Sequence, residues 1–257
     1  HDEKINKAWE KLFNYYYVSP GQFETNPIIA RPAFAEKDIR LKTEPVIGLG
    51  KLLESGEALK NIDSYQYDIV NISRQIFGQY AGHLLFEITG CYKKRDLALF
   101  EEKVREFITL AQKIEKLTGT REEFLFGKWI ADSRKKASTE EERKLYEWNA
   151  RAIITTWGGR ILYGYAIKDW SGLYSEYYIP KWEKFFAGMR DELNGGKKFD
   201  YENFKNEIIS WEDNWITQRA DNIQSSPSGD AFESARELWN LYGDKLLEIT
   251  RMNNSKN

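Results

Sequence analysis

The stretch IDSYQYDIVNISRQIFGQYAGHLLFEITGCYKK, residues 62–94, decides the fold class. Its stripe positions recur every three or four residues, in the order Ile62, Tyr65, Ile69, Ile72, Ile76, Tyr80, His83 and Phe86. Because an α-helix completes a turn in about 3.6 residues, this spacing places these side chains on one face. The stretch is therefore predicted to form a long amphipathic helix that packs against other helices.

The same helical period continues in both directions from this stretch. It recurs from Leu97 to Leu117 and again from Phe204 to Trp215, and residues 46–179 contain no proline. Proline interrupts helices, so its absence favours long ones, and the strict alternation typical of strands is missing. We predict an all-α fold, a helical bundle of about eight to nine helices with an irregular N-terminal loop segment, in a single domain over residues 1–257.

The expected helices and the irregular segments follow from the apolar stripes and the turn residues. The helices are expected at about 2–17, 44–58, 62–94, 96–118, 121–137, 139–155, 166–193, 200–222 and 229–251. Residues 18–43 and the turn around residues 157–160 are expected to be irregular. A connection of about 25 residues is longer than compact domains usually contain unless it has a function.

Local signals indicate where several of these helices begin. Thr120 with Glu123, and Ser138 with Glu141, fit the capping box, in which each side chain satisfies a backbone N–H of the other residue. Pro180 is expected to kink the helix predicted over 166–193.

The charge balance and the residue counts exclude several classes of partner. The 38 basic residues nearly balance the 40 acidic ones, for a net charge of −2, whereas binding to nucleic acid needs a basic surface. No run approaches the ~20 apolar residues of a membrane helix. One cysteine and two histidines do not make a zinc set. We therefore expect no nucleic acid, no membrane, no metal and no cofactor.

The sequence offers no self-contained catalytic group. Nucleophilic catalysis by serine or cysteine needs a base histidine, and only His1 and His83 are present. His83 lies on an apolar stripe and is expected to be a packed core histidine. Cys91 is expected to be a small buried residue.

Aromatic residues are concentrated between residues 157 and 182. Most of them are expected to pack in the core, but Trp157 and Tyr165 flank a Gly158–Gly159 turn, where rings can stand on the surface. A planar ring with a polar edge suits a sugar, because it offers an apolar face to C–H groups and a polar tip to hydroxyls. Sugar binding is thus one interpretation of this cluster.

Several ordered blocks of sequence carry a resemblance to a known family. They are ARP (30–32), YDIVNISRQ (67–75), FGKWI (126–130), YEWNAR (146–151), ITTWG (154–158), YA (165–166), WSGL (170–173) and YYIPKWEKFF (177–186). Together they resemble the C-terminal helical domain of the α-N-acetylglucosaminidase family of glycoside hydrolases, and the resemblance covers essentially the whole chain.

The resemblance implies that catalysis and pocket formation belong to different domains of a larger enzyme. In that family a separate (β/α)8 barrel carries two catalytic glutamates, and nothing in this chain matches a barrel. The resemblance implies a retaining glycosidase, in which two carboxyl groups flank the scissile bond about 5 to 5.5 Å apart. This chain then supplies one wall of the pocket, contacts the catalytic barrel domain of the same enzyme, and is inactive alone.

The resemblance also assigns site residues, position by position. Trp157 corresponds to a tryptophan that faces the sugar, and Tyr165 to a tyrosine of the same cleft. Ile161 or Leu162 is an apolar neighbour, and Glu24 lies near another cleft residue. No catalytic residue and no metal ligand is assigned to this chain.

The implied function is binding of a terminal N-acetylglucosamine for the exo-hydrolysis of glycans such as heparan sulfate. A periplasmic, secreted or lysosomal location is implied by the resemblance. The alternative is a non-catalytic helical module for glycan binding or protein interaction that lacks the barrel.

Overall fold

The computed structural model describes residues 3–18, 26–39, 41–157, 164, 166–219 and 222–254. Within these ranges the chain forms ten α-helices and no β-strand, which confirms the all-α prediction. The helices are α1 (Glu3–Phe13), α2 (Thr43–Glu54), α3 (Gly56–Leu59), α4 (Asp63–Lys94), α5 (Leu97–Thr118), α6 (Phe126–Arg134), α7 (Glu140–Ile153), α8 (Ile179–Leu193), α9 (Tyr201–Trp215) and α10 (Ala231–Asn254). Short π and 3-10 turns are η1 (Asn14–Val18), η2 (Pro27–Ile29), η3 (Glu122–Phe124) and η4 (Tyr174–Tyr178).

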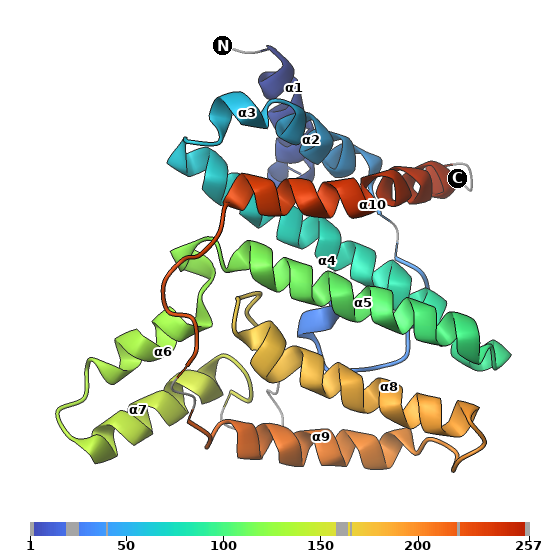
Figure 1. Cartoon of the computed structure of the whole chain (residues 1–257), viewed down its shortest axis with the longest axis vertical. Coiled ribbons are helices and arrows are strands. Elements are labelled where there is room, and N and C mark those ends of the chain that lie inside the picture. Colours follow the sequence, from blue (N-terminus) through green and yellow to red (C-terminus); the bar gives the residue numbers. More distant parts are fainter. Residues whose placement is uncertain are drawn as a thin grey trace.

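The pair α4 and α5 forms the centre of the molecule. The two helices run side by side, with α1, α2 and α10 gathered on one side and α8 and α9 on the other, while the α6–α7 hairpin lies at one end (Figure 1). Their bounds agree with the predicted ranges 62–94 and 96–118 to within one residue at each end. The two strongest stripes in the sequence therefore form the element on which the other helices pack.

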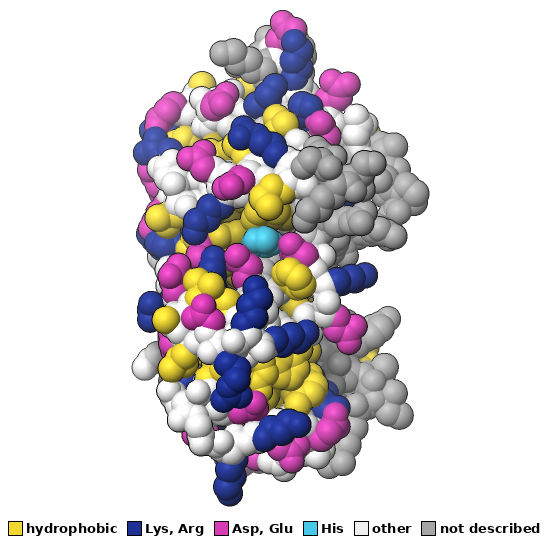
Figure 2. Space-filling model, turned by 90° about the vertical axis from the view of Figure 1, so that its right-hand side faces the viewer, with side chains coloured by type: hydrophobic (Ala, Val, Ile, Leu, Met, Phe, Trp, Pro, Cys, Tyr) yellow, Lys and Arg dark blue, Asp and Glu magenta, His cyan; other side chains and the backbone are white. Residues whose placement is uncertain are grey.

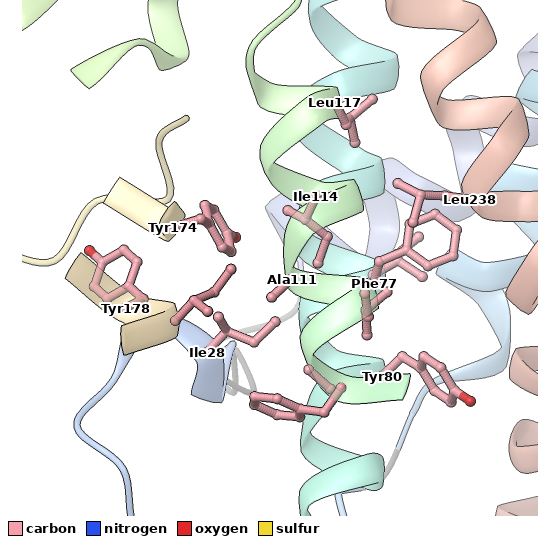
Figure 3. Close-up of a cluster of buried hydrophobic side chains, with 14 of the residues drawn as sticks. Ile28, Phe77, Tyr80, Ala111, Ile114, Leu117, Tyr174, Tyr178 and Leu238 are labelled. Carbon is pink, nitrogen blue, oxygen red and sulfur yellow. The ribbon is translucent and has the colours of Figure 1, made fainter. Parts of the chain in front are cut away.

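The core lies on both sides of this central pair. Ile28 and Tyr174 pack on one side of α5, and Phe77 and Leu238 pack on the other (Figure 3). All four are fully buried, and burial of apolar area is worth roughly 25 cal/mol per Å². Because the core lies on both sides of the α4–α5 pair, α4 buries two faces. Its apolar residues are therefore not confined to one narrow stripe.

The stripe prediction fails near the end of α4. Tyr65 through Tyr80 are buried as predicted, but His83 is only half-buried and Phe86 is exposed. The irregular segment 26–39 crosses the helix here: a Cβ on Gly82 would lie 2.6 Å from the Ile39 side chain. His83 consequently reaches the surface and meets Asp38, so it is not a core histidine.

The helix predicted over 166–193 begins later, at Ile179. Pro180 lies in the first turn of α8 and follows the π turn η4, whose last residue, Tyr178, also has a helical backbone. The kink at Pro180 stays a prediction. A first-turn residue needs no N–H partner within the helix, which makes proline acceptable there. Ahead of the turn, Ser171 forms an isolated bridge with Leu125.

Both predicted capping boxes need correction. The box that forms is one residue later, where the Glu142 N–H donates to Thr139 Oγ1 at 3.1 Å and the Glu142 carboxylate accepts from the Thr139 N–H. Thr120 does not cap a helix, because its hydroxyl donates to the Leu117 carbonyl. The Glu123 carboxylate pairs instead with Arg121, and α6 begins only at Phe126.

Candidate functional site

The described part of the candidate site is built at the end of α7. After Ile153 the chain turns, and the Trp157 N–H donates to the Ala152 carbonyl at 2.6 Å. The Thr155 carbonyl accepts from the Gly164 N–H at 2.9 Å. This second bond joins Gly164 to Thr155, while Trp157 itself is held by its bond to Ala152.

Trp157 has a left-handed backbone, with a φ of 53°. For a residue other than glycine this conformation costs roughly 1–2 kcal/mol. The side chain is 37% exposed, so burial of the indole does not compensate the cost fully. Strain of this kind is concentrated at functional sites, and here it presents a large aromatic ring at the surface.

The other predicted site residues cannot be placed beside Trp157. Tyr165, Ile161, Leu162 and Glu24 lie outside the described residues. Trp157 is therefore the member of the predicted set whose geometry the structure gives.

A buried ion pair holds the last turns of α7. Arg151 is 1% exposed, and its guanidinium donates to Glu147 Oε1 at 3.1 Å. The other oxygen of Glu147 lies 2.6 Å from Arg134 on α6. Burial lowers the pKa of Arg151, although Glu147 opposes this effect. Arg151 thus braces the helix that leads into the Trp157 turn.

A second buried network holds the chain just after the turn. The Asp169 carboxylate lies 3.0 Å from Arg74 Nη1 on α4 and accepts from the Tyr174 hydroxyl. Asn26 donates to the same hydroxyl at 3.1 Å. Burial raises the pKa of Asp169, against the opposing effect of Arg74.

Sequence reasoning missed this Arg74–Asp169 network. The sequence did mark Arg74 as notable, because this residue belongs to the block YDIVNISRQ that carries the family resemblance. The bond joins residues 95 positions apart in the chain, so it is visible only in the folded structure.

Exposed apolar side chains gather on the α6–α7 hairpin. Trp129, Leu145, Trp148 and Ile153 are each more than a third exposed, and we call them the hairpin surface. The Trp129 indole is held in place, since its N–H donates to the Ala150 carbonyl at 2.9 Å. Single exposed apolar residues are common, and these four share two helices that contact each other.

One face of the molecule has mixed charge. Figure 2 shows acidic and basic side chains interspersed over one face, with small hydrophobic areas between them. His83 Nδ1 lies 3.0 Å from Asp38 Oδ1, and its Nε2 lies 3.8 Å from Glu87 Oε2. The two carboxylates thus orient the ring.

Other reactive groups are few within the described ranges. Cys91 is buried, and burial raises the pKa of its thiol, which makes it a poor nucleophile. No set of three or more His, Cys, Asp or Glu side chains in these ranges is arranged to hold a metal ion. Nor does any helix there combine the length and apolar character needed to cross a membrane.

Comparison with known proteins gives one family. The α-N-acetylglucosaminidase (NAGLU) C-terminal domain matches residues 1–240. Human α-N-acetylglucosaminidase is 26% identical over 244 residues, which cover 91% of this chain and 33% of the human protein.

Solved structures agree with the sequence match. A family 89 glycoside hydrolase from Clostridium perfringens, in complex with 2-acetamido-1,2-dideoxynojirmycin, is 26% identical with a TM-score of 0.84, over 94% of this chain and 30% of that one. The Clostridium perfringens enzyme in complex with its substrate GlcNAc-α-1,4-galactose is 27% identical with a TM-score of 0.85, over 96% of this chain and 31% of that one. The chain spans about a third of the length of these relatives.

Proposed function

Since the chain belongs to the α-N-acetylglucosaminidase C-terminal domain family, we propose that residues 1–257 are one helical domain of a larger glycoside hydrolase that removes terminal N-acetylglucosamine from glycans. The chain spans about a third of its relatives, so the rest of such an enzyme supplies the reaction. Heparan sulfate is a candidate substrate, and a periplasmic, secreted or lysosomal location is part of the same proposal.

The observation that carries this proposal is the conformation of Trp157. Its backbone has a φ of 53°, its N–H donates to the Ala152 carbonyl, and its indole is 37% exposed. An exposed ring in a fixed orientation can stack on the apolar C–H face of a sugar. Tyr165, Ile161, Leu162 and Glu24 are proposed to complete the same wall.

Catalysis is proposed to come from carboxylates outside this chain. A retaining mechanism needs a nucleophile and an acid about 5 to 5.5 Å apart on either side of the bond. Of the two most buried glutamates among the described residues, Glu147 pairs with three arginines and Glu212 with one arginine and one lysine. Such carboxylates serve the fold and are poor nucleophiles.

The hairpin surface is proposed to contact the catalytic domain of the same enzyme. It lies on the hairpin whose second helix ends at the Trp157 turn. An interface there excludes water from apolar side chains and places the indole at the domain boundary, where ligand pockets commonly form.

Substitution of Trp157 by alanine in the complete enzyme tests the function. Loss of the stacking surface should lower kcat/KM for an α-N-acetylglucosaminide by about 10- to 100-fold, or roughly 1.4–2.7 kcal/mol of transition-state stabilisation. The melting temperature should change little, because a partly exposed ring leaves no large cavity.

Phe86→Ala is the matched control. Phe86 is also 37% exposed but lies on α4, so its loss should leave kcat/KM unchanged. A large fall in melting temperature for Trp157→Ala, with normal kinetics of the folded enzyme, would show that Trp157 is a packing residue.

A further inference from the structure

A small polar cavity lies between the N-terminal helix and α4. Its volume is about 190 Å³, and its wall includes Trp9, Tyr16, Asp68, Asn71 and Gln75. Sites for drug-sized ligands occupy roughly 300–1,000 Å³. The cavity is thus suited to one ring-sized ligand or one unit of a longer chain.

The side-chain amides of Asn71 and Gln75 in this wall have fixed orientations, and each keeps hydrogen-bonding capacity that no group of the described residues uses. Arg74 Nη2 donates to Asn71 Oδ1 at 2.7 Å, and a guanidinium only donates, so the Asn71 NH2 group remains available. Gln75 Nε2 donates to the Asn71 backbone carbonyl at 3.0 Å, which leaves Gln75 Oε1 as an acceptor. Asn71 therefore keeps a free donor and Gln75 a free acceptor, and both residues line the cavity.

Two further groups have unused hydrogen-bonding capacity. The Tyr16 hydroxyl is buried without a hydrogen-bond partner, and burial of an unpaired hydroxyl is unfavourable. The Asp68 carboxylate is half-buried, and burial raises its pKa. A ligand that donates hydrogen bonds would satisfy the Asp68 carboxylate.

We propose that this cavity binds a single sugar ring, with Asp68 and Gln75 accepting from hydroxyls, Asn71 donating to them, and Trp9 and Tyr16 packing on the ring. Neighbouring hydroxyls of a sugar both donate and accept, which matches this mixed set. A cationic amine would use the carboxylate and the rings, but the Arg74 guanidinium beside Asn71 repels it. The choice of a glycan ligand rests on the proposed function, whereas the cavity and its free groups do not.

The test is an NMR titration of the 257-residue chain labelled at its tryptophan indoles. N-acetylglucosamine, galactose and methylammonium are added separately, and the indole signal of Trp9, assigned with Trp9→Phe, is followed. One of the two sugars should shift this signal in a saturable manner. Asp68→Asn and Asn71→Ala should each weaken that binding by about tenfold or more, since each removes a polar contact.

Two controls and one replacement variant separate the possible outcomes. Asp244→Asn changes an exposed aspartate on α10 and should leave binding unchanged. Trp157→Ala should also leave the Trp9 titration unchanged, so a failure of the proposed function is recognised separately. Gln75→Leu keeps a good helix former in α4 and is used if another variant does not fold.

The inference is overturned by any of three results. The Trp9 signal does not respond to either sugar, or it responds equally in Asp68→Asn and the unmodified chain, or methylammonium binds and both sugars do not.

Discussion

At the scale of single residues, the most unusual environment is that of Lys181. Its ammonium is buried 2.9 Å from Glu212 Oε1 and 3.8 Å from the centre of the Tyr177 ring. Arg31 holds the other oxygen of Glu212 at 2.6 Å. Burial lowers the pKa of Lys181 to about 8, although Glu212 opposes the change. Burial alone would raise the pKa of Glu212, but its two cations outweigh it and leave that pKa low.

Substitution of Glu212 by glutamine should cost about 3–5 kcal/mol at pH 6, because it leaves Lys181 charged and buried without a carboxylate. The loss should shrink at pH 9. Without Glu212 the pKa of Lys181 falls further below its unfolded value, so the folded state binds fewer protons than the unfolded state and stability rises with pH. Urea unfolding at the two pH values measures this.

Glu202→Gln is the control for that experiment. Glu202 is exposed and pairs with Lys205 one turn away, an interaction worth only a few tenths of a kcal/mol. An equal loss for Glu212→Gln at both pH values would contradict the role assigned to Lys181.

Residue-level chemistry was only partly predictable from the sequence. Trp157 stood out because it precedes two glycines and lies in a block of family resemblance. The positive φ of Trp157 was not predictable, because backbone propensities favour glycine in that conformation. A tryptophan adopts a positive φ only when the surrounding bonds impose it. The contacts of Lys181 join α8 to α9 and to Arg31, and no local pattern predicts contacts between segments so far apart.

At the scale of elements, helix type was predictable and helix ends were not. The apolar period predicts α4 and α5 reliably, because many positions in each helix fit the same helical spacing. An end depends on a few groups, and two neighbouring pairs, Ser138 with Glu141 and Thr139 with Glu142, fit the same capping pattern. The structure selects the second pair.

The two candidate caps can be distinguished by substitution. Thr139→Ala should destabilise the protein by about 1 kcal/mol, because it removes the acceptor for the Glu142 N–H. Ser138→Ala should change stability by less than about 0.5 kcal/mol, since the Glu142 carboxylate binds the Ser138 backbone N–H rather than its hydroxyl. Chemical unfolding of both variants gives the comparison, and a larger loss for Ser138→Ala would restore the sequence prediction.

At the scale of the whole molecule, the sequence defines a bundle but not its layout. Three apolar stripes in the sequence show that the helices bury one side each. The stripes do not show that α8 and α9 lie across α5 from α10, because that arrangement depends on which helix surfaces fit together. Ten helices form within the described ranges where eight or nine were expected. The difference reflects short pieces such as α3, which follows Ser55 and is too brief to show a period.

The proposed contact with a catalytic domain predicts a difference between the isolated chain and the complete enzyme. Trp148→Glu should leave the stability of the 257-residue chain within about 0.5 kcal/mol, because Trp148 is an exposed surface residue. In the complete enzyme it should lower the melting temperature, since it buries a charge in an apolar interface. Leu241→Glu, on exposed α10 surface, should have no effect in either. Equal melting shifts for both substitutions would exclude the hairpin surface as the interface.

The position of α10 has a consequence for how the protein is made. α10 packs on α2 and α4, yet it is the last of these three helices to be synthesised. Translation proceeds at about 5–20 residues per second, so the nascent α4 waits on the order of 10 s for this neighbour. During that interval the apolar side chains that α10 later covers face the cytosol or a translocation channel, and we expect a chaperone to shelter them until residues 231–254 have emerged from the ribosome.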